Sequence, residues 1–245
     1  LGIKDKTFDV QGFGAVGKWA SKFIEEVGGK ITTVVEYNSA CHNPNGLDVQ
    51  ALKDHLTKHG TVATFPGATD SCAENPLAYL CKPADCLIPA AVEKSLHKGN
   101  AECISVKAVF EGANGPTTYA AEQIFLRRGI VCAPDMLVNG GGVTCSYFEW
   151  LKNLDHVAPG RLTKKYQLKS QARLLELMGF SDKIGLLEGA DEVDIVYSGL
   201  EEIMTSATRE NWEFAVKNNL SFRNACFVNA INKVYTSIRE TGLMI

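Results

Sequence analysis

Residues 7–17 read TFDVQGFGAVG and decide the fold of this chain. The first four of them have strand-forming character, and they lead into a turn with the spacing G-x-G-x-x-G at Gly12, Gly14 and Gly17. An apolar stripe of helical period follows the turn, at Val16, Trp19, Ala20, Phe23, Ile24 and Val27. The first glycine permits a tight turn, the second lets backbone approach a pyrophosphate, and the third lets helix pack closely on strand. A strand, this turn and a helix in that order are typical of the first βαβ unit of a dinucleotide-binding fold.

An acidic residue ends the next predicted strand. Residues 31–35 read ITTVV, and Glu36 follows the last glycine of the turn by about 20 residues, the spacing at which an acid contacts the adenosine ribose. A carboxylate there accepts hydrogen bonds from the ribose hydroxyls and repels a 2′-phosphate. No Arg or Lys occurs between Tyr37 and Gly46. We therefore expect NAD as the cofactor, with NADP possible but weaker. The alternative is that Glu36 is a solvated residue at the end of a strand.

Strands and helices alternate through the first 130 or so residues, which favours a parallel sheet built of βαβ units with right-handed crossovers. After residue 36, the sequence predicts strands at 84–88, 106–110 and 130–132 and helices at 48–60 and 117–128. We expect an α/β fold, namely a Rossmann-like, doubly wound, mostly parallel sheet. Ligands of such a sheet collect beyond the carboxyl ends of its strands.

The last hundred residues carry helical patterns only. Helices are expected through Trp150 and Leu154, at 191–218 and at 222–241, with one amphipathic segment in the polar stretch 159–185. We expect a single domain over residues 1–245, with a mostly helical C-terminal extension over 143–245.

Composition excludes several classes of protein. The chain has 245 residues, 45% hydrophobic and 22% charged, as in ordinary globular proteins. Its formal net charge of −3 gives no electrostatic reason to expect a nucleic acid or an anionic membrane as partner. No apolar run approaches the roughly 20 residues that span a bilayer. We expect neither nucleic-acid binding nor a membrane.

Cysteine and histidine spacing predicts no metal site. The eight cysteines include no C-x-x-C pair, and several lie in apolar stretches, so we expect reduced, structural thiols. His55 and His59 have the spacing of H-E-x-x-H, but Leu56 occupies the position of the glutamate.

Six motifs in chain order carry a family resemblance. They are DVQGFG (9–14), NPNGLD (43–48), IPAA (88–91), EGANGPTT (111–118), GGVTCSYFEW (141–150) and FRNACFVNA (222–230). Over nearly its whole length the chain resembles the cofactor-binding domain of glutamate dehydrogenase, of the hexameric kind found in animals and some protists. Residues 161–189 stand where animal enzymes insert a longer helical antenna.

The resemblance implies which residues bind the cofactor. The pyrophosphate turn comprises Gln11, Gly12, Phe13, Gly14, Ala15 and Val16. Glu36 binds the adenosine ribose, Ala90 and Ala91 flank the cofactor, and Asn114 and Asn139 hold its nicotinamide half. An amide offers both a donor and an acceptor to a carboxamide or ribose. Both asparagines adjoin glycine, so the alternative for each is a turn residue.

The resemblance also implies a substrate residue and an allosteric residue. Ser146 is the donor to the side-chain carboxylate of glutamate, unless it is a helical serine bonded to its own backbone. Arg223 matches an arginine that the family associates with ADP, unless it pairs with a neighbouring residue.

The chain resembles half of an enzyme. In the family, the lysine and aspartate that handle the amine steps lie in an N-terminal substrate domain, inside a Gly-rich lysine motif that residues 1–245 do not contain. The full enzyme oxidatively deaminates L-glutamate to 2-oxoglutarate and ammonia, with hydride transfer to NAD(P). We expect the isolated chain to bind cofactor without turnover, since hydride transfer needs both carbons held together.

The resemblance further implies the protein's surroundings. The expected partners are glutamate or 2-oxoglutarate, the missing N-terminal domain and, at full length, five further copies in a homo-hexamer. The expected location is the mitochondrial matrix, or alternatively the cytoplasm. Two other functions stay open, namely a dehydrogenase of another amino acid and a non-catalytic NAD-sensing or interaction module. Ser146 argues against an apolar amino acid, which has no use for a hydroxyl.

Overall fold

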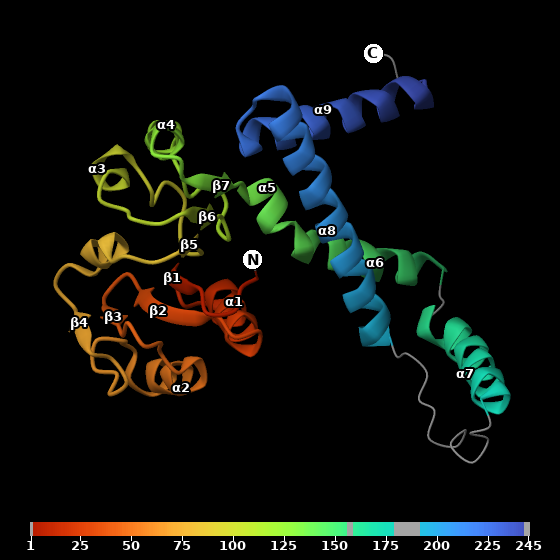
Figure 1. Ribbon diagram of the computed structural model, residues 1–245, viewed down its shortest axis with the longest axis horizontal. Coiled ribbons are helices and arrows are strands. Elements are labelled where there is room, and N and C mark those ends of the chain that lie inside the picture. Colours follow the sequence, from red (N-terminus) through yellow and green to blue (C-terminus); the bar gives the residue numbers. More distant parts are fainter. Residues whose placement is uncertain (1, 156–158, 179–191, 243–245) are drawn as a thin grey trace. The chain divides into compact units, whose positions relative to one another are not determined.

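The computed structural model describes residues 2–155, 159–178 and 192–242 (Figure 1). The chain divides into two compact units. The first combines Leu1–Asn139 with Asn211–Ile245, and the second is Gly140–Glu210.

The first unit is built on a seven-stranded sheet of order β4-β3-β2-β1-β5-β6-β7. The strands are β1 (Thr7–Gln11), β2 (Lys30–Val35), β3 (Ala40–His42), β4 (Asp70–Cys72), β5 (Cys86–Pro89), β6 (Ala108–Phe110) and β7 (Val131–Ala133). The five strands from β2 through β1 to β7 pair in parallel, whereas β3 and β4 pair antiparallel. The predicted fold class, an α/β Rossmann-like and mostly parallel sheet, is confirmed.

The order of the strands reverses beside β1. From β1 the chain passes to β2 on one side, and it later returns to place β5 on the other side of β1. Gln11 at the end of β1 pairs with Pro89 at the end of β5. The loops that leave these two strands therefore diverge at one point of the sheet edge, which is where open α/β sheets bind ligands.

Helices cover both faces of the sheet. In the first unit they are α1 (Ala15–Glu26), α2 (Val49–His59), the 3₁₀ helix η1 (Pro76–Cys81), α3 (Lys98–Ala101), α4 (Tyr119–Arg127), α5 (Asp135–Val138) and α9 (Phe222–Thr241). The predicted ends of α2 are confirmed, because the Asp48 carboxylate accepts from the backbone N–H of Ala51 and Gly60 ends the helix with φ of 69°.

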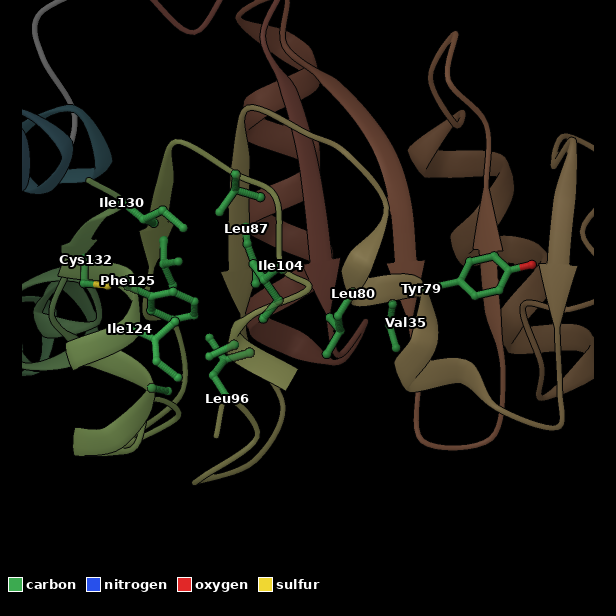
Figure 2. Packing of buried hydrophobic residues seen from close by; sticks show 14 of the residues in the cluster. Val35, Tyr79, Leu80, Leu87, Leu96, Ile104, Ile124, Phe125, Ile130 and Cys132 are labelled. Carbon is green, nitrogen blue, oxygen red and sulfur yellow. The ribbon is translucent and has the colours of Figure 1, made fainter. Parts of the chain in front are cut away.

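Two hydrophobic cores form because side chains alternate along each strand. Val34 lies in the core under α1 and α2, whereas its neighbour Val35 lies in the core under η1, α3 and α4. Figure 2 shows this second core, which contains Phe125 of α4 and Leu87 of β5. The sheet is thus buried on both faces, as a doubly wound fold requires.

Helix α1 packs on the sheet through a face that only partly coincides with its predicted apolar stripe. Gly17, Ser21 and Ile24 are buried, and Ile24 belongs to the stripe, whereas four other apolar residues of the stripe are half exposed. Those residues are Val16, Trp19, Phe23 and Val27. The helix itself was correctly predicted. Its packing face is set by Gly17, because a Cβ there would lie 1.9 Å from the Gly12 carbonyl oxygen.

The second unit contains α6 (Gly140–Asp155), α7 (Pro159–Leu177) and the part of α8 (Glu192–Asn218) up to Glu210. Phe148 of α6 packs on Gly199 of α8, where an added Cβ would lie 3.2 Å from the ring. The predicted helices of this region are confirmed. Part of the expected shortened antenna, residues 179–189, lies outside the described residues. In the described part of the chain, no helix is long and apolar enough to cross a membrane.

The expectation of reduced thiols is wrong for one pair of cysteines. Cys81 at the end of η1 and Cys103 just after α3 form a disulfide, with Cα atoms 5.2 Å apart. Packing of η1 and α3 in the same core brings the two together across 22 residues, which sequence spacing alone does not reveal. The other six cysteines are free, and burial raises the pKa of the Cys132 thiol to about 12, so that thiol stays protonated.

Candidate functional site

The glycine turn leaves β1 at the point where the strand order reverses. Gly12 has φ of +86°, a conformation that favours glycine, and its N–H donates to the Val35 carbonyl oxygen at 2.7 Å. A Cβ on Gly12 would lie 2.8 Å from the Ala90 carbonyl oxygen and 2.8 Å from the Ala91 Cβ. The structure therefore brings the turn and the predicted alanine pair into direct contact, and small residues are needed on both sides.

The other two glycines of the turn differ in their surroundings. Gly17 has no room for a side chain, as described for α1, whereas a Cβ on Gly14 would meet no atom within 4 Å. Gly14 is also the N-cap of α1, which has no acidic residue in its first turn and no side-chain cap. The first N–H groups of a helix lack internal partners and carry partial positive charge. An anion such as a phosphate fits at this open helix start.

Glu36 is joined to the glycine turn. It follows β2, and its Oε1 accepts a hydrogen bond from the backbone N–H of Phe13. Its own N–H donates to the Ser39 carbonyl oxygen at 2.8 Å. The carboxylate is therefore held beside the turn rather than solvated alone at a strand end. The predicted pyrophosphate turn and the predicted ribose acid form one site.

Gln11 contributes an unsatisfied acceptor at the same edge. The residue is 5% exposed, and its side-chain Oε1 is buried without a hydrogen-bond partner in the described part of the chain. Most buried polar atoms in proteins are paired, so this one calls for a donor. The ribose hydroxyls and the carboxamide of a dinucleotide are donors of the kind that this acceptor lacks. Cofactor binding by these residues nevertheless remains a prediction.

The two predicted nicotinamide residues also come together. Asn114 lies in the loop after β6, and Asn139 ends α5 after β7. The Asn139 Nδ2 donates to the Asn114 Oδ1 at 2.7 Å, across 25 residues of sequence. Gly112 and Ala113 tie this loop to β5 through the Pro89 carbonyl oxygen, at 3.0 and 2.9 Å. Because both asparagines also lie at turns, the cofactor role and the turn role both stay open.

Arg223 of α9 is held by acidic side chains. Its Nη2 lies 2.6 Å from Glu111 Oε1, its Nε 2.9 Å from Glu122 Oε2, and its Nη1 3.5 Å from Asp135 Oδ1. Burial alone would lower the pKa of Arg223, but the carboxylates of Glu111 and Glu122 raise it above the usual value, so it stays charged. Pairing with neighbours, the alternative kept open for Arg223, is confirmed. Its ADP role stays a prediction.

Sequence reasoning assigned no role to the carboxylates around Arg223. Glu111 is fully buried at the end of β6, and Glu122 is 7% exposed on the packed face of α4, between Ala121 and Ile124. An acid within a predicted apolar face is a signal, because a buried charge needs a partner. The sequence could not identify that partner, which lies about a hundred residues further along the chain.

Ser146 belongs to the second unit, on α6. Its hydroxyl donates to the Gly142 carbonyl oxygen at 3.1 Å, one helical turn before it. Thr144 makes the same kind of bond to Gly140 at 3.0 Å. The alternative reading of Ser146, a helical serine bonded to its own backbone, thus describes this structure, while its substrate role stays a prediction.

The described residues contain no group of three or more His, Cys, Asp or Glu placed to hold a metal ion. The rings of His55 and His59 stack with centroids 4.4 Å apart, and His55 Nε2 lies 3.0 Å from the Thr64 hydroxyl.

Comparison with known proteins gives a consistent family match. The family model described as Glutamate/Leucine/Phenylalanine/Valine dehydrogenase matches residues 1–173. The chain is 45% identical over 249 residues to "Glutamate dehydrogenase, mitochondrial" of Dictyostelium discoideum, covering 98% of the chain and 49% of that protein. It is 34% identical to "NAD-specific glutamate dehydrogenase" of Clostridioides difficile, covering 99% of the chain and 50% of that protein. The chain thus spans about half the length of these curated relatives.

Solved structures agree with the fold. A glutamate dehydrogenase of Peptoniphilus asaccharolyticus has a TM-score of 0.70 at 27% identity, covering 98% of this chain and 48% of that one. A hetero-hexameric glutamate dehydrogenase of Thermus thermophilus has a TM-score of 0.77 at 22% identity, covering 100% of this chain and 50% of that one. The second likeness is one of fold alone.

Proposed function

Because the chain belongs to the Glutamate/Leucine/Phenylalanine/Valine dehydrogenase family, we propose that it is the dinucleotide-binding part of a glutamate dehydrogenase. The complete protein would oxidise L-glutamate to 2-oxoglutarate and ammonia, with hydride transfer to a nicotinamide dinucleotide. The glutamate dehydrogenases of Dictyostelium discoideum and Thermotoga maritima, 45% and 37% identical to this chain, support glutamate as the substrate.

One observation carries the cofactor part of the proposal. The open helix start at Gly14 lies in the same turn as Phe13, whose N–H is bonded to Glu36. Backbone N–H groups of the turn would hold the pyrophosphate, and the Glu36 carboxylate would accept from the adenosine ribose. Asn114 and Asn139 would hold the nicotinamide half, and Ala90 and Ala91 would flank the cofactor. When bound, the dinucleotide supplies the acceptor for the substrate hydride.

We propose NAD as the preferred dinucleotide. The negative charge of Glu36 opposes a 2′-phosphate, and the segment 37–46 offers no Lys or Arg to receive one. The C. difficile relative named as NAD-specific is 34% identical over nearly the whole chain, which supports this preference. NADP would bind more weakly.

The chain's own residues would bind and orient rather than carry out the acid–base steps. Ser146 would leave its bond to Gly142 and donate to the side-chain carboxylate of glutamate. The amine chemistry would need residues from an N-terminal part like that of the longer relatives. Turnover by this chain alone is therefore not expected, because reacting groups must be held together to react.

We further propose that the complete protein is a homo-hexamer in the mitochondrial matrix. The homo-hexamer rests on the family resemblance, since the hetero-hexameric Thermus thermophilus structure is a likeness of fold alone. Location is supported by the mitochondrial Dictyostelium relative.

A titration of the 245-residue chain with NADH, followed by nicotinamide fluorescence, tests the proposal. We expect saturable binding that ADP-ribose competes away, because both share the pyrophosphate and the adenosine ribose. We also expect no glutamate-dependent formation of NADH by the same preparation. Absence of NADH binding by the folded chain would refute the cofactor assignment, and glutamate oxidation would refute the dependence on a second part.

A further inference from the structure

We propose that Arg223 is a positioning residue for the nicotinamide end of the cofactor site, acting through Glu111 and Asp135. This inference rests on the proposed function. It gives helix α9 a part in the cofactor site, although α9 contains no proposed cofactor ligand. A chain of hydrogen bonds within the first unit carries the inference.

Glu111 is the first link. One of its carboxylate oxygens bonds to Arg223 Nη2 at 2.6 Å, and the other accepts from the backbone N–H of Asp135 at 2.8 Å. Glu111 is fully buried at the end of β6, so both oxygens depend on these protein partners for the hydrogen bonds that water would otherwise supply. The carboxylate thereby fixes the start of α5 relative to Arg223.

Asp135 is the second link, and it reaches both asparagines. Its Oδ2 accepts from the backbone N–H of Gly115 at 2.8 Å, directly after Asn114. Its carbonyl oxygen accepts from the backbone N–H of Asn139 at 3.0 Å. The two asparagine side chains then bond to each other at 2.7 Å. The position of Asp135 therefore sets where both predicted nicotinamide residues lie.

The charge balance explains why an arginine holds this arrangement. Three carboxylates converge on one guanidinium whose side chain is 15% exposed. Without the cation they would repel one another in a region of weak solvent screening, and Asp135 would move away from Glu111. The planar guanidinium meets carboxylates from three directions, which a lysine ammonium reproduces only in part.

All three nitrogens of the guanidinium take part in these contacts. Its Nε, Nη1 and Nη2 each face a carboxylate oxygen, within 2.9, 3.5 and 2.6 Å. Arg223 would thus influence cofactor binding by placing the loop 111–118, without itself contacting the dinucleotide.

Paired titrations with NADH and ADP-ribose test this inference, because ADP-ribose lacks only the nicotinamide. Arg223→Met and Asp135→Ala should each raise the Kd for NADH about tenfold, since small displacements of positioning groups are costly. The Kd for ADP-ribose should stay near its wild-type value in both variants. Arg223→Lys should recover part of the NADH affinity.

Glu122→Gln is the matched control. Glu122 bonds to the same guanidinium from α4, at 2.9 Å, but lies outside the loop that carries Asn114. It should leave the ratio of the two Kd values unchanged even if it lowers the melting temperature. If circular dichroism shows that Arg223→Met does not fold, Asp135→Ala decides alone, because it leaves the Glu111 and Glu122 pairs in place.

The outcomes separate this inference from the proposed function. If the wild-type chain binds neither ligand, the proposed function fails. If it binds both but Arg223→Met and Asp135→Ala weaken them equally, or weaken neither, the positioning role is wrong while dinucleotide binding stands. The positioning role is also wrong if the wild-type chain binds NADH and ADP-ribose equally tightly. It is wrong as well if Glu122→Gln changes the ratio of the two Kd values as much as Arg223→Met does.

Discussion

The Glu36 carboxylate accepts a hydrogen bond from the backbone N–H of Phe13, which lies 23 residues earlier in the glycine turn. The acid at the end of β2 and the turn at the end of β1 are thus one structural unit, joined where their strands lie side by side. A change at Glu36 therefore acts on the ribose site directly and on the pyrophosphate turn through Phe13.

Glu36→Gln should change the choice between dinucleotides. Glutamine keeps the oxygen that accepts from Phe13 and removes only the negative charge. The ratio of NADPH to NADH affinity should rise about tenfold, which corresponds to about 1.4 kcal/mol of charge repulsion removed. Fluorescence titrations with both reduced cofactors measure it. Glu26→Gln, the loss of an exposed acid on α1, is the control. An unchanged ratio in Glu36→Gln would argue against the NAD assignment.

Gly14→Ala should weaken NADH binding without unfolding the protein. A Cβ there meets no protein atom within 4 Å, but it would occupy the space in front of the α1 N-terminus. We expect the Kd to rise at least about tenfold while the free energy of unfolding changes by less than about 1 kcal/mol.

Gly17→Ala, by contrast, should lower the stability of the protein. Its Cβ would lie 1.9 Å from the Gly12 carbonyl oxygen, so the turn and α1 must separate. The expected loss of stability is more than about 2 kcal/mol. Urea unfolding and NADH titration of both variants distinguish them. Equal binding by Gly14→Ala and wild type would exclude the helix start as the phosphate site.

Asp9→Asn should stabilise the protein at neutral pH. Asp9 is 1% exposed in β1, and its Oδ2 is buried with no partner among the described residues. Burial raises the pKa of this carboxyl from 3.8 to about 6, while the hydrogen bonds from Thr33 and Thr32 oppose the shift. Between these two pKa values the folded chain holds a proton that the unfolded chain has lost. The free energy of unfolding contributed by Asp9 therefore falls as pH rises from about 4 to 6 and stays low above that range.

Asp9→Asn should raise the free energy of unfolding by on the order of 2 kcal/mol above about pH 7. Near pH 4 the increase should be close to zero. Denaturant unfolding at several pH values measures it, with the exposed Asp54→Asn as the control. A gain of equal size at both ends of the pH range would show that ionisation of Asp9 is not its cause.

Reduction of the Cys81–Cys103 disulfide should destabilise the first unit. The bond closes a loop with a sequence separation of 22. Loop closure of this length contributes on the order of 3 kcal/mol by restricting the unfolded chain. Cys81→Ser should show a similar loss, whereas Cys72→Ser, at the free cysteine that ends β4, should not.

A thiol assay checks the same bond independently. The unreduced chain, unfolded in denaturant, should present six reactive thiols of its eight cysteines. Eight reactive thiols would show that Cys81 and Cys103 are reduced in the purified protein, as the sequence alone suggested.

Much of the fold could be predicted where consecutive residues encode it. The β1–turn–α1–β2 unit follows from the residues themselves, because glycine alone suits the Gly12 conformation and a β-branched run favours β2. The ends of α2 were predicted because Asp48 and Gly60 supply a cap and a left-handed terminus from within the helix's own sequence.

Strands β3 and β4 were not predicted, because each is three residues long and has no periodic pattern to reveal it. Cys41 forms part of a strand because it pairs with Val34 on one side and Ser71 on the other. Such short strands are stabilised by their neighbours rather than by intrinsic preference. The packed face of α1 was predicted only in part, through Ile24, since burial of Ser21 rather than Trp19 depends on what the helix packs against.

By itself the sequence determined the glycine turn, the acid at Glu36 and the alternation of strands and helices, because spacing and backbone preference act between near neighbours. Only the tertiary structure decided that Arg223 meets Glu111, 112 residues before it, and that Cys81 meets Cys103. It also decided that Asn114 bonds to Asn139. Such contacts depend on which distant segments the two hydrophobic cores bring together. The sequence around a buried charge or thiol does not identify the distant residue that pairs with it.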